Sequence, residues 1–210
     1  MNLINYWHRW RALWRISSGQ HYLQQTGWLA STATGHSVLP DGTPLPWLVY
    51  PCISFIKPRL SKDMTVFEYG SGYGTLWWAQ RVQFVEAVED NPAWVAKVQP
   101  HCPDNATIHH INQQAGSYPL SAQQGQHAPY DIIIIDGPRR KACLEQCLPA
   151  LKENGVILLD DSERPEYRSA TKKLVRDHGF KRLDFVGLAP IFANVKQTSI
   201  FYKTDNVLGI

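Results

Sequence analysis

The stretch that most constrains the fold is TVFEYGSGYGTLWW, residues 65–78. Its first five residues are apolar-rich and β-prone, so we expect a strand, and the residues after the third glycine can form a helix. Three glycines at every second position, Gly70, Gly72 and Gly74, separate the two. Glycines let the backbone approach a ligand, and a helix N-terminus offers unpaired N–H groups. The stretch therefore predicts a ligand-binding turn, although an ordinary tight turn has the same pattern.

The rest of the chain alternates strands with helices. YDIIIID, residues 130–136, has four consecutive isoleucines, which indicates a strand buried on both faces in the centre of a parallel sheet. Further strands are expected at residues 84–89, 106–112, 156–159, 180–186 and 198–203. Helices are expected at residues 53–59, 75–82, 93–99, 142–151 and 165–178, with a turn at Asn154-Gly155. This alternation predicts an α/β fold.

The glycine spacing is G-x-G-x-G instead of the dinucleotide fingerprint G-x-G-x-x-G, and Glu68 stands two residues before the first glycine. FEYGSGYG resembles motif I of the class I S-adenosylmethionine (SAM)-dependent methyltransferases, and the resemblance extends over residues 65–203. It implies a Rossmann-like fold: a mostly parallel seven-stranded sheet with an antiparallel terminal strand and helices on both faces. We expect an N-terminal helix and aromatic collar or lid over residues 1–62, and the SAM-binding domain over 63–210.

The resemblance also implies which residues bind SAM. In this family the glycine turn packs against the amino-acid and ribose parts of the cofactor, and the acidic residue lies beneath its amino group. A carboxylate about 20 residues after the turn can accept the ribose hydroxyls, here Glu89, or Asp90 if the strand ends one residue later. Asp90-Asn91-Pro92 also has the pattern of a helix start. The predicted cofactor-binding residues are Glu68, Gly70, Ser71, Gly72, Gly74, Glu89, Asp90 and Ser117.

Three aspartates, Asp136, Asp160 and Asp161, follow two predicted strands and should meet at one edge of the sheet. Such carboxylates repel one another unless a cation, an arginine or a shared proton compensates, and oxygen ligands favour Mg²⁺. The pattern resembles metal-dependent O-methyltransferases related to catechol O-methyltransferase. That family has a general-base lysine where this chain has Arg139, and a guanidinium does not deprotonate usefully. A metal on the three aspartates and Asp136 as a metal-free base are both open.

IDGPRR followed by LLDDSERPEY resembles small-molecule or sugar O-methyltransferase-like proteins. We therefore expect a SAM-dependent methyltransferase acting on a hydroxyl, with Asp136 and Arg139 as the catalytic candidates. Two alternatives from other classes stay open. One is a catalytically silent methyltransferase fold that binds a partner, and the other is a nicotinamide-dependent oxidoreductase.

Residues 1–16 project onto an amphipathic helix with a tryptophan-rich side and an arginine-rich side. Such a helix can pack on its own domain, pack on a second subunit in a homodimer, or lie on a membrane surface. We expect packing. In the collar, His21, His36 and Tyr50 could face a substrate, or could simply pack.

The net charge of +3 comes from three arginines in the first fifteen residues, which leaves 18 basic and 18 acidic residues elsewhere. A chain without a broad basic surface is not expected to bind nucleic acid. The four cysteines have neither a disulfide-framework nor a zinc spacing, and no apolar run approaches the roughly 20 residues of a membrane span. We expect a cytoplasmic protein with reduced cysteines.

Overall fold

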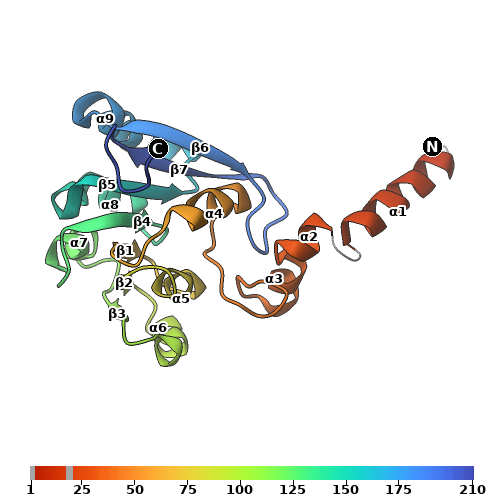
Figure 1. The fold of residues 1–210 in the computed structure, drawn as a ribbon, viewed down its shortest axis with the longest axis horizontal. Coiled ribbons are helices and arrows are strands. Elements are labelled where there is room, and N and C mark those ends of the chain that lie inside the picture. Colours follow the sequence, from red (N-terminus) through yellow and green to blue (C-terminus); the bar gives the residue numbers. More distant parts are fainter. Residues whose placement is uncertain (1–2, 18–20) are drawn as a thin grey trace.

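The structure is a computed structural model that describes residues 3–17 and 21–210. A sheet with helices on both faces forms its body, and the N-terminal helix projects away from that body (Figure 1). The strands are β1 Thr65–Tyr69, β2 Phe84–Glu89, β3 Ala106–His110, β4 Tyr130–Ile135, β5 Leu151–Asp160, β6 Lys181–Gly187 and β7 Lys196–Tyr202.

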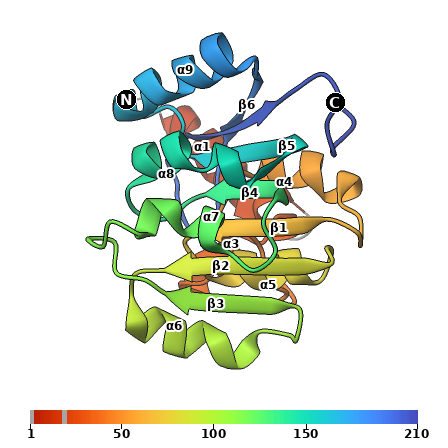
Figure 2. The ribbon, with the colours of Figure 1, turned by 90° about the vertical axis from the view of Figure 1, so that its left-hand side faces the viewer.

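The sheet has the strand order β3-β2-β1-β4-β5-β7-β6 (Figure 2). Strands β1 to β5 pair in parallel, whereas β7 lies antiparallel to both β5 and β6. The mostly parallel seven-stranded sheet with an antiparallel terminal strand, predicted from the sequence, is confirmed. Parallel strands put their carboxyl ends at one edge, where open α/β sheets bind ligands.

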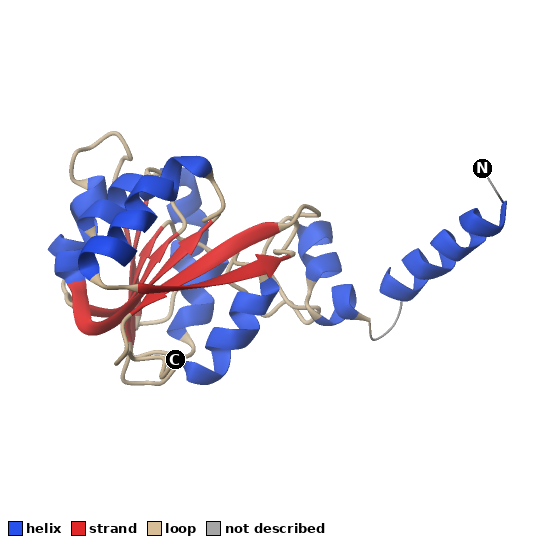
Figure 3. Ribbon diagram, turned by 90° about the horizontal axis from the view of Figure 1, so that it is seen from above, coloured by secondary structure: helices blue, strands red, loops and turns tan. Residues whose placement is uncertain are grey.

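Helices cover both faces of this sheet (Figure 3). The α-helices are α1 Leu3–Ser17, α2 Tyr22–Gln25, α3 Trp28–Thr34, α4 Tyr50–Ile56, α5 Tyr73–Ala79, α6 Pro92–Val98, α7 Ser121–Gln124, α8 Arg140–Gln146 and α9 Arg168–His178. Short 3₁₀ turns occur at Lys57–Arg59, Gln99–His101, Tyr118–Leu120, Leu148–Ala150 and Pro165–Tyr167.

The isoleucine run of β4 divides the core into two layers. Ile132 and Ile134 pack with α4 and α5 on one face, and Ile133 and Ile135 pack with α8 and α9 on the other. All four side chains are fully buried. Successive strand residues point to opposite faces, so a strand covered on both sides must be apolar at every position.

Two elements differ most from their predicted bounds, and the helix expected over residues 53–59 spans Tyr50–Ile56 instead. The helix expected over residues 142–151 begins at Arg140 and ends at Gln146, because Pro149 cannot donate a helical hydrogen bond and a 3₁₀ turn follows. The strand expected from Val156 begins at Leu151 instead. Asn154-Gly155 lies in a bulge of β5, where the register with β4 shifts between the partners Tyr130–Leu151 and Ile132–Val156.

The second half of the collar is joined to the sheet. The backbone N–H of Tyr50 donates to the carbonyl of Leu188 at 2.9 Å, and the N–H of Val49 donates to Thr198 Oγ1 at 3.3 Å. Several apolar residues of this segment belong to the core, namely Leu45, Leu48, Val49, Cys52, Ile53 and Ile56. These contacts hold residues 35–47 beside the carboxyl ends of the strands.

Helix α1 does not pack its aromatic side on the domain. The exposed fractions of Trp7, Trp10 and Trp14 are 59%, 64% and 68%. For the residues that the structure describes, the expectation of packing on the chain's own domain was therefore wrong, and residues 1–2 of the predicted helix lie outside them. Within residues 3–17 and 21–210, no helix has the length and apolar content needed to cross a bilayer.

Asp131 links three strands, and its removal should destabilise the sheet. Its Oδ2 accepts from the Thr65 backbone N–H at 2.7 Å and from Lys152 Nζ at 2.8 Å. We expect Asp131→Ala to lower the free energy of unfolding by about 1–3 kcal/mol, because the partly buried Thr65 N–H loses its acceptor, while Lys152, whose side chain is 37% exposed, adds little. Urea titration measures this. Asp104→Ala, at an exposed site, should change it by no more than about 0.5 kcal/mol. Equal losses in both variants would contradict the assigned role.

Candidate active site

A cavity of about 520 Å³ opens at the carboxyl ends of β1, β2, β4 and β5. The glycine turn after β1 and Glu89 at the end of β2 line one side. Asp136, Asp160 and Asp161 line the other side. Residues of the collar, including His36 and Trp47, form part of the wall.

The glycine turn places backbone where a side chain would not fit. Gly70 has φ 91°, and a Cβ there would lie 2.9 Å from the backbone nitrogen of Gly137. Both Asp136 and Gly137 donate their N–H groups to the carbonyl of Tyr69, at 3.0 and 2.6 Å. A Cβ at Gly74 would lie 2.9 Å from Glu68 Oε1. The turn is therefore in direct contact with the end of β4 and with Glu68.

Glu68 is a buried carboxyl group beneath the glycine turn. The hydroxyl of Thr75 donates to its Oε2, and the N–H of Gly72 donates to the same hydroxyl oxygen at 3.0 Å. Burial raises the pKa of Glu68 to about 8. Without a cation nearby, Glu68 is therefore mostly protonated at neutral pH.

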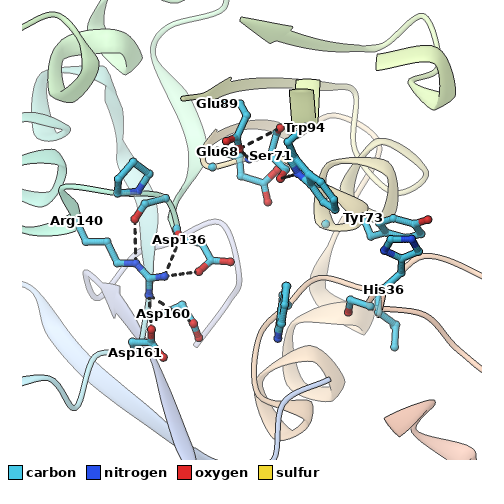
Figure 4. A pocket seen from close by; sticks show the side chains of 18 of the residues that line it. His36, Glu68, Ser71, Tyr73, Glu89, Trp94, Asp136, Arg140, Asp160 and Asp161 are labelled. Atoms are coloured by element: carbon cyan, nitrogen blue, oxygen red, sulfur yellow. Dashed lines mark hydrogen bonds and ion pairs between the residues drawn. The ribbon is translucent and has the colours of Figure 1, made fainter. Parts of the chain in front are cut away.

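Glu89 holds the turn to the start of α6. Its Oε2 accepts from the N–H of Ser71 at 2.9 Å, and its Oε1 accepts from the N–H groups of Asp90 and Asn91 at 3.1 and 3.0 Å. Burial raises the pKa of Glu89 despite these hydrogen bonds. The indole of Trp94 donates to the carbonyl of Ser71 at 2.8 Å (Figure 4).

A buried guanidinium lies among the three aspartates. Arg140 Nη2 is 2.9 Å from Asp136 Oδ1, and Arg140 Nη1 is 3.5 Å from Asp160 Oδ2 and 3.1 Å from Asp161 Oδ2 (Figure 4). Arg140 Nε also donates to the carbonyl of Gly137 at 3.1 Å. The sequence brings the three carboxylates together as predicted, and Arg140 compensates their repulsion.

Two further cations contact Asp161, namely Arg164 and Lys196. Asp160 Oδ1 accepts from the hydroxyl of Thr198 at 2.7 Å. Burial and the neighbouring Asp160 raise the pKa of Asp136 well above its usual range, and Arg140 opposes this. Burial also raises the pKa of Asp160. Burial lowers the pKa of Arg140, but the aspartates outweigh that effect and raise it.

The structure assigns Arg140, not Arg139, to the cavity. Arg139 has φ 55°, is exposed, and donates to the carbonyls of Gln113 and Ala115 at 3.0 and 3.2 Å. The sequence does not show which of the two adjacent arginines, Arg139 or Arg140, points into the cavity. Arg140 is four residues after Asp136, but Asp136 lies in the loop before α8, so the helical i,i+4 rule does not predict their contact. No group of three His, Cys, Asp or Glu side chains is arranged to hold a metal in the described part of the chain.

Other predicted residues are divided between the cavity and its surroundings. Glu68, Gly70, Ser71, Gly72, Gly74 and Glu89 all line the cavity. Asp90 and Ser117 do not, and the Asp90 carboxylate accepts from Gln113 Nε2 at 2.9 Å. Asn91 caps α6 through Oδ1, so the predicted helix start is present beside Glu89.

Among the three collar residues, only His36 lines the cavity, where its ring stacks on Tyr73 at 4.9 Å. Tyr50 is buried in the core, and His21 is an exposed residue before α2. Several other residues that line the cavity were not predicted from the sequence; loops, α6 and the start of β7 contribute them, namely Trp47, Trp94, Arg164, Phe192 and Lys196.

The protonation of Glu68 predicts a pH-dependent stability. Because its folded pKa is raised from 4.5 to about 8, ionisation of Glu68 destabilises the folded state as pH rises through that window. Glu68→Gln cannot ionise, so relative to wild type it should gain stability from pH 5 to about pH 8 and level off above that pH. Chemical denaturation across this range measures the difference. Glu166→Gln, at an exposed position, serves as control, and a pH-independent difference for Glu68→Gln would contradict the coupling.

Comparisons with known proteins agree with this geometry. A family model described as a methyltransferase domain matches residues 67–162. The fold is similar to that of a putative caffeoyl-CoA O-methyltransferase from Staphylococcus aureus, with a TM-score of 0.58 and 13% identity over 93% of this chain and 98% of that chain. It is also similar to that of precorrin 8W decarboxylase from Methanobacterium thermoautotrophicum, with a TM-score of 0.55 and 20% identity over 81% and 97%.

A putative methyltransferase from Streptococcus mutans in complex with SAH has a TM-score of 0.52 and 13% identity, over 71% of this chain and 94% of that chain. No curated protein matches the sequence significantly. At these identities the solved structures establish the fold alone, and the family model adds the domain type. The resemblance seen in the sequence is confirmed at the level of the domain: residues 67–162 match a methyltransferase domain, and the chain shares its fold with methyltransferases of known structure.

Proposed function

We propose that this chain transfers a methyl group from SAM to a hydroxyl oxygen of a small-molecule or sugar acceptor, with Asp136 as general base. The observation that carries the proposal is the position of the Asp136 carboxylate, which lines the same cavity as the glycine turn. Arg140 holds Oδ1, whereas Oδ2 has no hydrogen-bond partner among the described residues, and the side chain is 27% exposed.

The residues on the turn side of the cavity fit the cofactor. Gly70, Gly72 and Gly74 line the cavity without side chains, so a ligand can approach the backbone of the turn closely, while Gly70 and Gly74 lie tight against Gly137 and Glu68. Glu68 and Glu89 would lie near the amino group and the ribose, and a cation beside Glu68 would favour its ionised form. The cavity volume is in the range of small-molecule sites. When bound, SAM supplies an electrophilic methyl group on its sulfonium.

Asp136 is suited to accept the proton of a hydroxyl acceptor. A carboxylate with a raised pKa is a stronger base than an ordinary one, and general-base catalysis contributes about 10²–10⁴-fold. Arg140 fixes the orientation of Asp136 through a charge-assisted hydrogen bond, and its positive charge favours the developing negative oxygen of the acceptor. The guanidinium cannot itself take the proton.

Mg²⁺ on Asp136, Asp160 and Asp161 is the alternative to this assignment. A divalent ion there would have to displace Arg140, which contacts all three carboxylates and is itself 13% exposed. We favour Arg140 as the compensating cation, so methyl transfer should not require added metal. Around this cluster, the aromatic rings of Trp47, Tyr73 and Phe192 line the cavity and would limit the access of water.

Binding and turnover should be separable by two substitutions. Asp136→Asn should keep the affinity for S-adenosylhomocysteine (SAH) and lower the rate of methyl transfer by about 10²–10⁴-fold, because only the base is lost. Gly72→Trp should abolish SAH binding, because its Cβ would already lie 3.4 Å from the Trp94 ring. Calorimetric titration measures binding, and transfer of labelled methyl to a panel of phenols and sugars measures turnover.

Gly116→Trp is the matched control, because a Cβ at Gly116 meets nothing within 4 Å and the residue does not line the cavity. Wild-type turnover in Asp136→Asn would remove the base assignment. Full SAH affinity in Gly72→Trp would remove the turn assignment. A rate that falls with EDTA and returns with Mg²⁺ would favour the metal over Arg140.

A further inference from the structure

We propose that the acceptor carries an anionic group beside an aromatic ring, with Arg164 and Lys196 binding the anion and Trp47 and Phe192 packing on the ring. This inference rests on the proposed function, because it names the substrate class of the same cavity. All four side chains line the cavity. Ion pairs join Arg164 and Lys196 to Asp161, and ring contacts join Lys196 to Phe192 and Phe192 to Trp47.

A buried carboxylate fixes both cations. Arg164 Nη2 pairs with Asp161 Oδ2, and Lys196 Nζ pairs with Asp161 Oδ1, while the Asp161 side chain is only 2% exposed. Arg164 and Lys196 come from different segments, one after β5 and one at the start of β7, so Asp161 gathers them at one place. Side chains held in position lose less entropy when a ligand binds.

These two cations keep unused hydrogen-bond donors, and Arg164 is far more exposed than Arg140. Arg140 Nε and Nη2 donate to Gly137 and Asp136, whereas its Nη1 is buried beside Asp160 and Asp161, where it makes ion-pair contacts and no hydrogen bond within the described residues. Arg164 Nε and Nη1 have no hydrogen-bond or ion-pair partner in the described part of the chain, and the side chain is 47% exposed. Lys196 has three donor hydrogens and one ion-pair partner. The remaining donors suit a carboxylate or phosphate oxygen.

In this cluster the negative charges lie deeper in the cavity than the most exposed positive charge. Three cations and three aspartates balance formally, but Asp160 and Asp161 are buried, with side chains 5% and 2% exposed. Arg164 is the most exposed member of the group. An acceptor entering from solvent therefore meets positive charge first, and the buried carboxylates act behind it.

An aromatic pair stands next to the cations. The rings of Trp47 and Phe192 are 5.5 Å apart and tilted by 31°, and their exposed fractions are 38% and 40%. Lys196 Nζ is 4.4 Å from the centre of the Phe192 ring. The indole N–H of Trp28 donates to the carbonyl of Phe192 at 2.9 Å and holds this loop. Exposed rings beside a cation suit a planar ligand that carries a negative group.

Two probes that differ by one carboxylate test this inference. Titration with SAH present should show that 3,4-dihydroxybenzoate binds at least about tenfold more tightly than catechol, a preference that salt weakens. Lys196→Met and Arg164→Gln should each reduce the preference, because one of the two anion donors is lost. Lys196→Arg should retain it.

Arg168→Gln is the matched control, because Arg168 is exposed and does not line the cavity. Equal affinity of the wild type for both probes, or no binding of either while SAH binds, would overturn the inference and leave the proposed function intact. Failure of SAH itself to bind would count against the proposed function, and the two probes can then be compared without it.

A second, independent observation concerns α1. We infer that α1 binds an anionic lipid surface. Exposed fractions of 52%, 59%, 64%, 58% and 68% are found at Tyr6, Trp7, Trp10, Leu13 and Trp14. These side chains form one stripe on a helix that projects from the body (Figure 1). Tryptophan and tyrosine favour the boundary between lipid tails and water.

The charges of α1 indicate which kind of partner this stripe of side chains binds. Arg9, Arg11 and Arg15 are accompanied by no acidic residue in the first fifteen. Arg9 and Arg11 flank the aromatic stripe in the helical projection, and Arg11 lies 4.7 Å from the centre of the Trp7 ring. Arginines can extend from an apolar face to phosphate groups. A second copy of α1 would bring like charges together, so the charge complementarity favours lipid.

Sedimentation of the full chain with vesicles tests this inference. The protein should pellet with phosphatidylcholine vesicles that contain phosphatidylglycerol and much less with phosphatidylcholine alone. Trp7→Ser with Trp10→Ser, or Arg9→Gln with Arg11→Gln, should each lower the affinity by about tenfold or more. Val175→Ser on α9, at a 43% exposed residue, is the control. No vesicle binding, or a dimer that the tryptophan substitutions dissociate without vesicle binding, would overturn the inference.

Discussion

The contact of Arg140 with three carboxylates is the interaction on which the site depends. Asp136 follows β4, Asp160 ends β5 and Asp161 follows it, so adjacent parallel strands bring like charges to one edge. Leaving one such charge buried and unpaired costs several kcal/mol, about 3–5 by analogy with broken buried ion pairs. The guanidinium removes that cost and fixes the direction of each carboxylate. The shape of the acceptor side of the cavity follows from this arrangement.

The three aspartates of this cluster have different roles. Asp136 has only Oδ1 bound to Arg140, which leaves Oδ2 for the proposed role toward the acceptor, and Asp160 is held by Thr198 on β7. Asp161 is committed to three cations, so its role is to position them. An antiparallel β7 beside β5 is needed for this, because it places Lys196 and Thr198 next to the ends of the parallel strands. The terminal strand thus contributes to the chemistry of the site as well as to the sheet.

Much of the fold could be predicted from the sequence, because residues close together in the chain determine most of the strands and helices. The first two strands match their predicted bounds, because apolar runs beside glycines and an Asp-Asn-Pro helix start leave few alternatives. The cofactor side of the cavity follows from the same stretch. The acceptor side does not, because Trp47 and Phe192 reach it from loops and Lys196 from the start of β7, all distant in sequence from the glycine turn. The choice between Arg139 and Arg140 depended on a positive φ at residue 139, which no residue pattern indicates.

Gly70 and Gly137 touch through their backbones, since a Cβ at either one would lie within 3.0 Å of the other's main chain. This backbone contact joins the end of β1, on the cofactor side of the cavity, to the end of β4, on the acceptor side. A shift of either strand end would therefore shift the other. Substitutions at the contact between Gly70 and Gly137 would disturb both sides of the cavity, so they are a poor route to a different acceptor. Substitutions of Trp47 in the collar and of Phe192 in the loop before β7 can change the acceptor side while that contact stays intact.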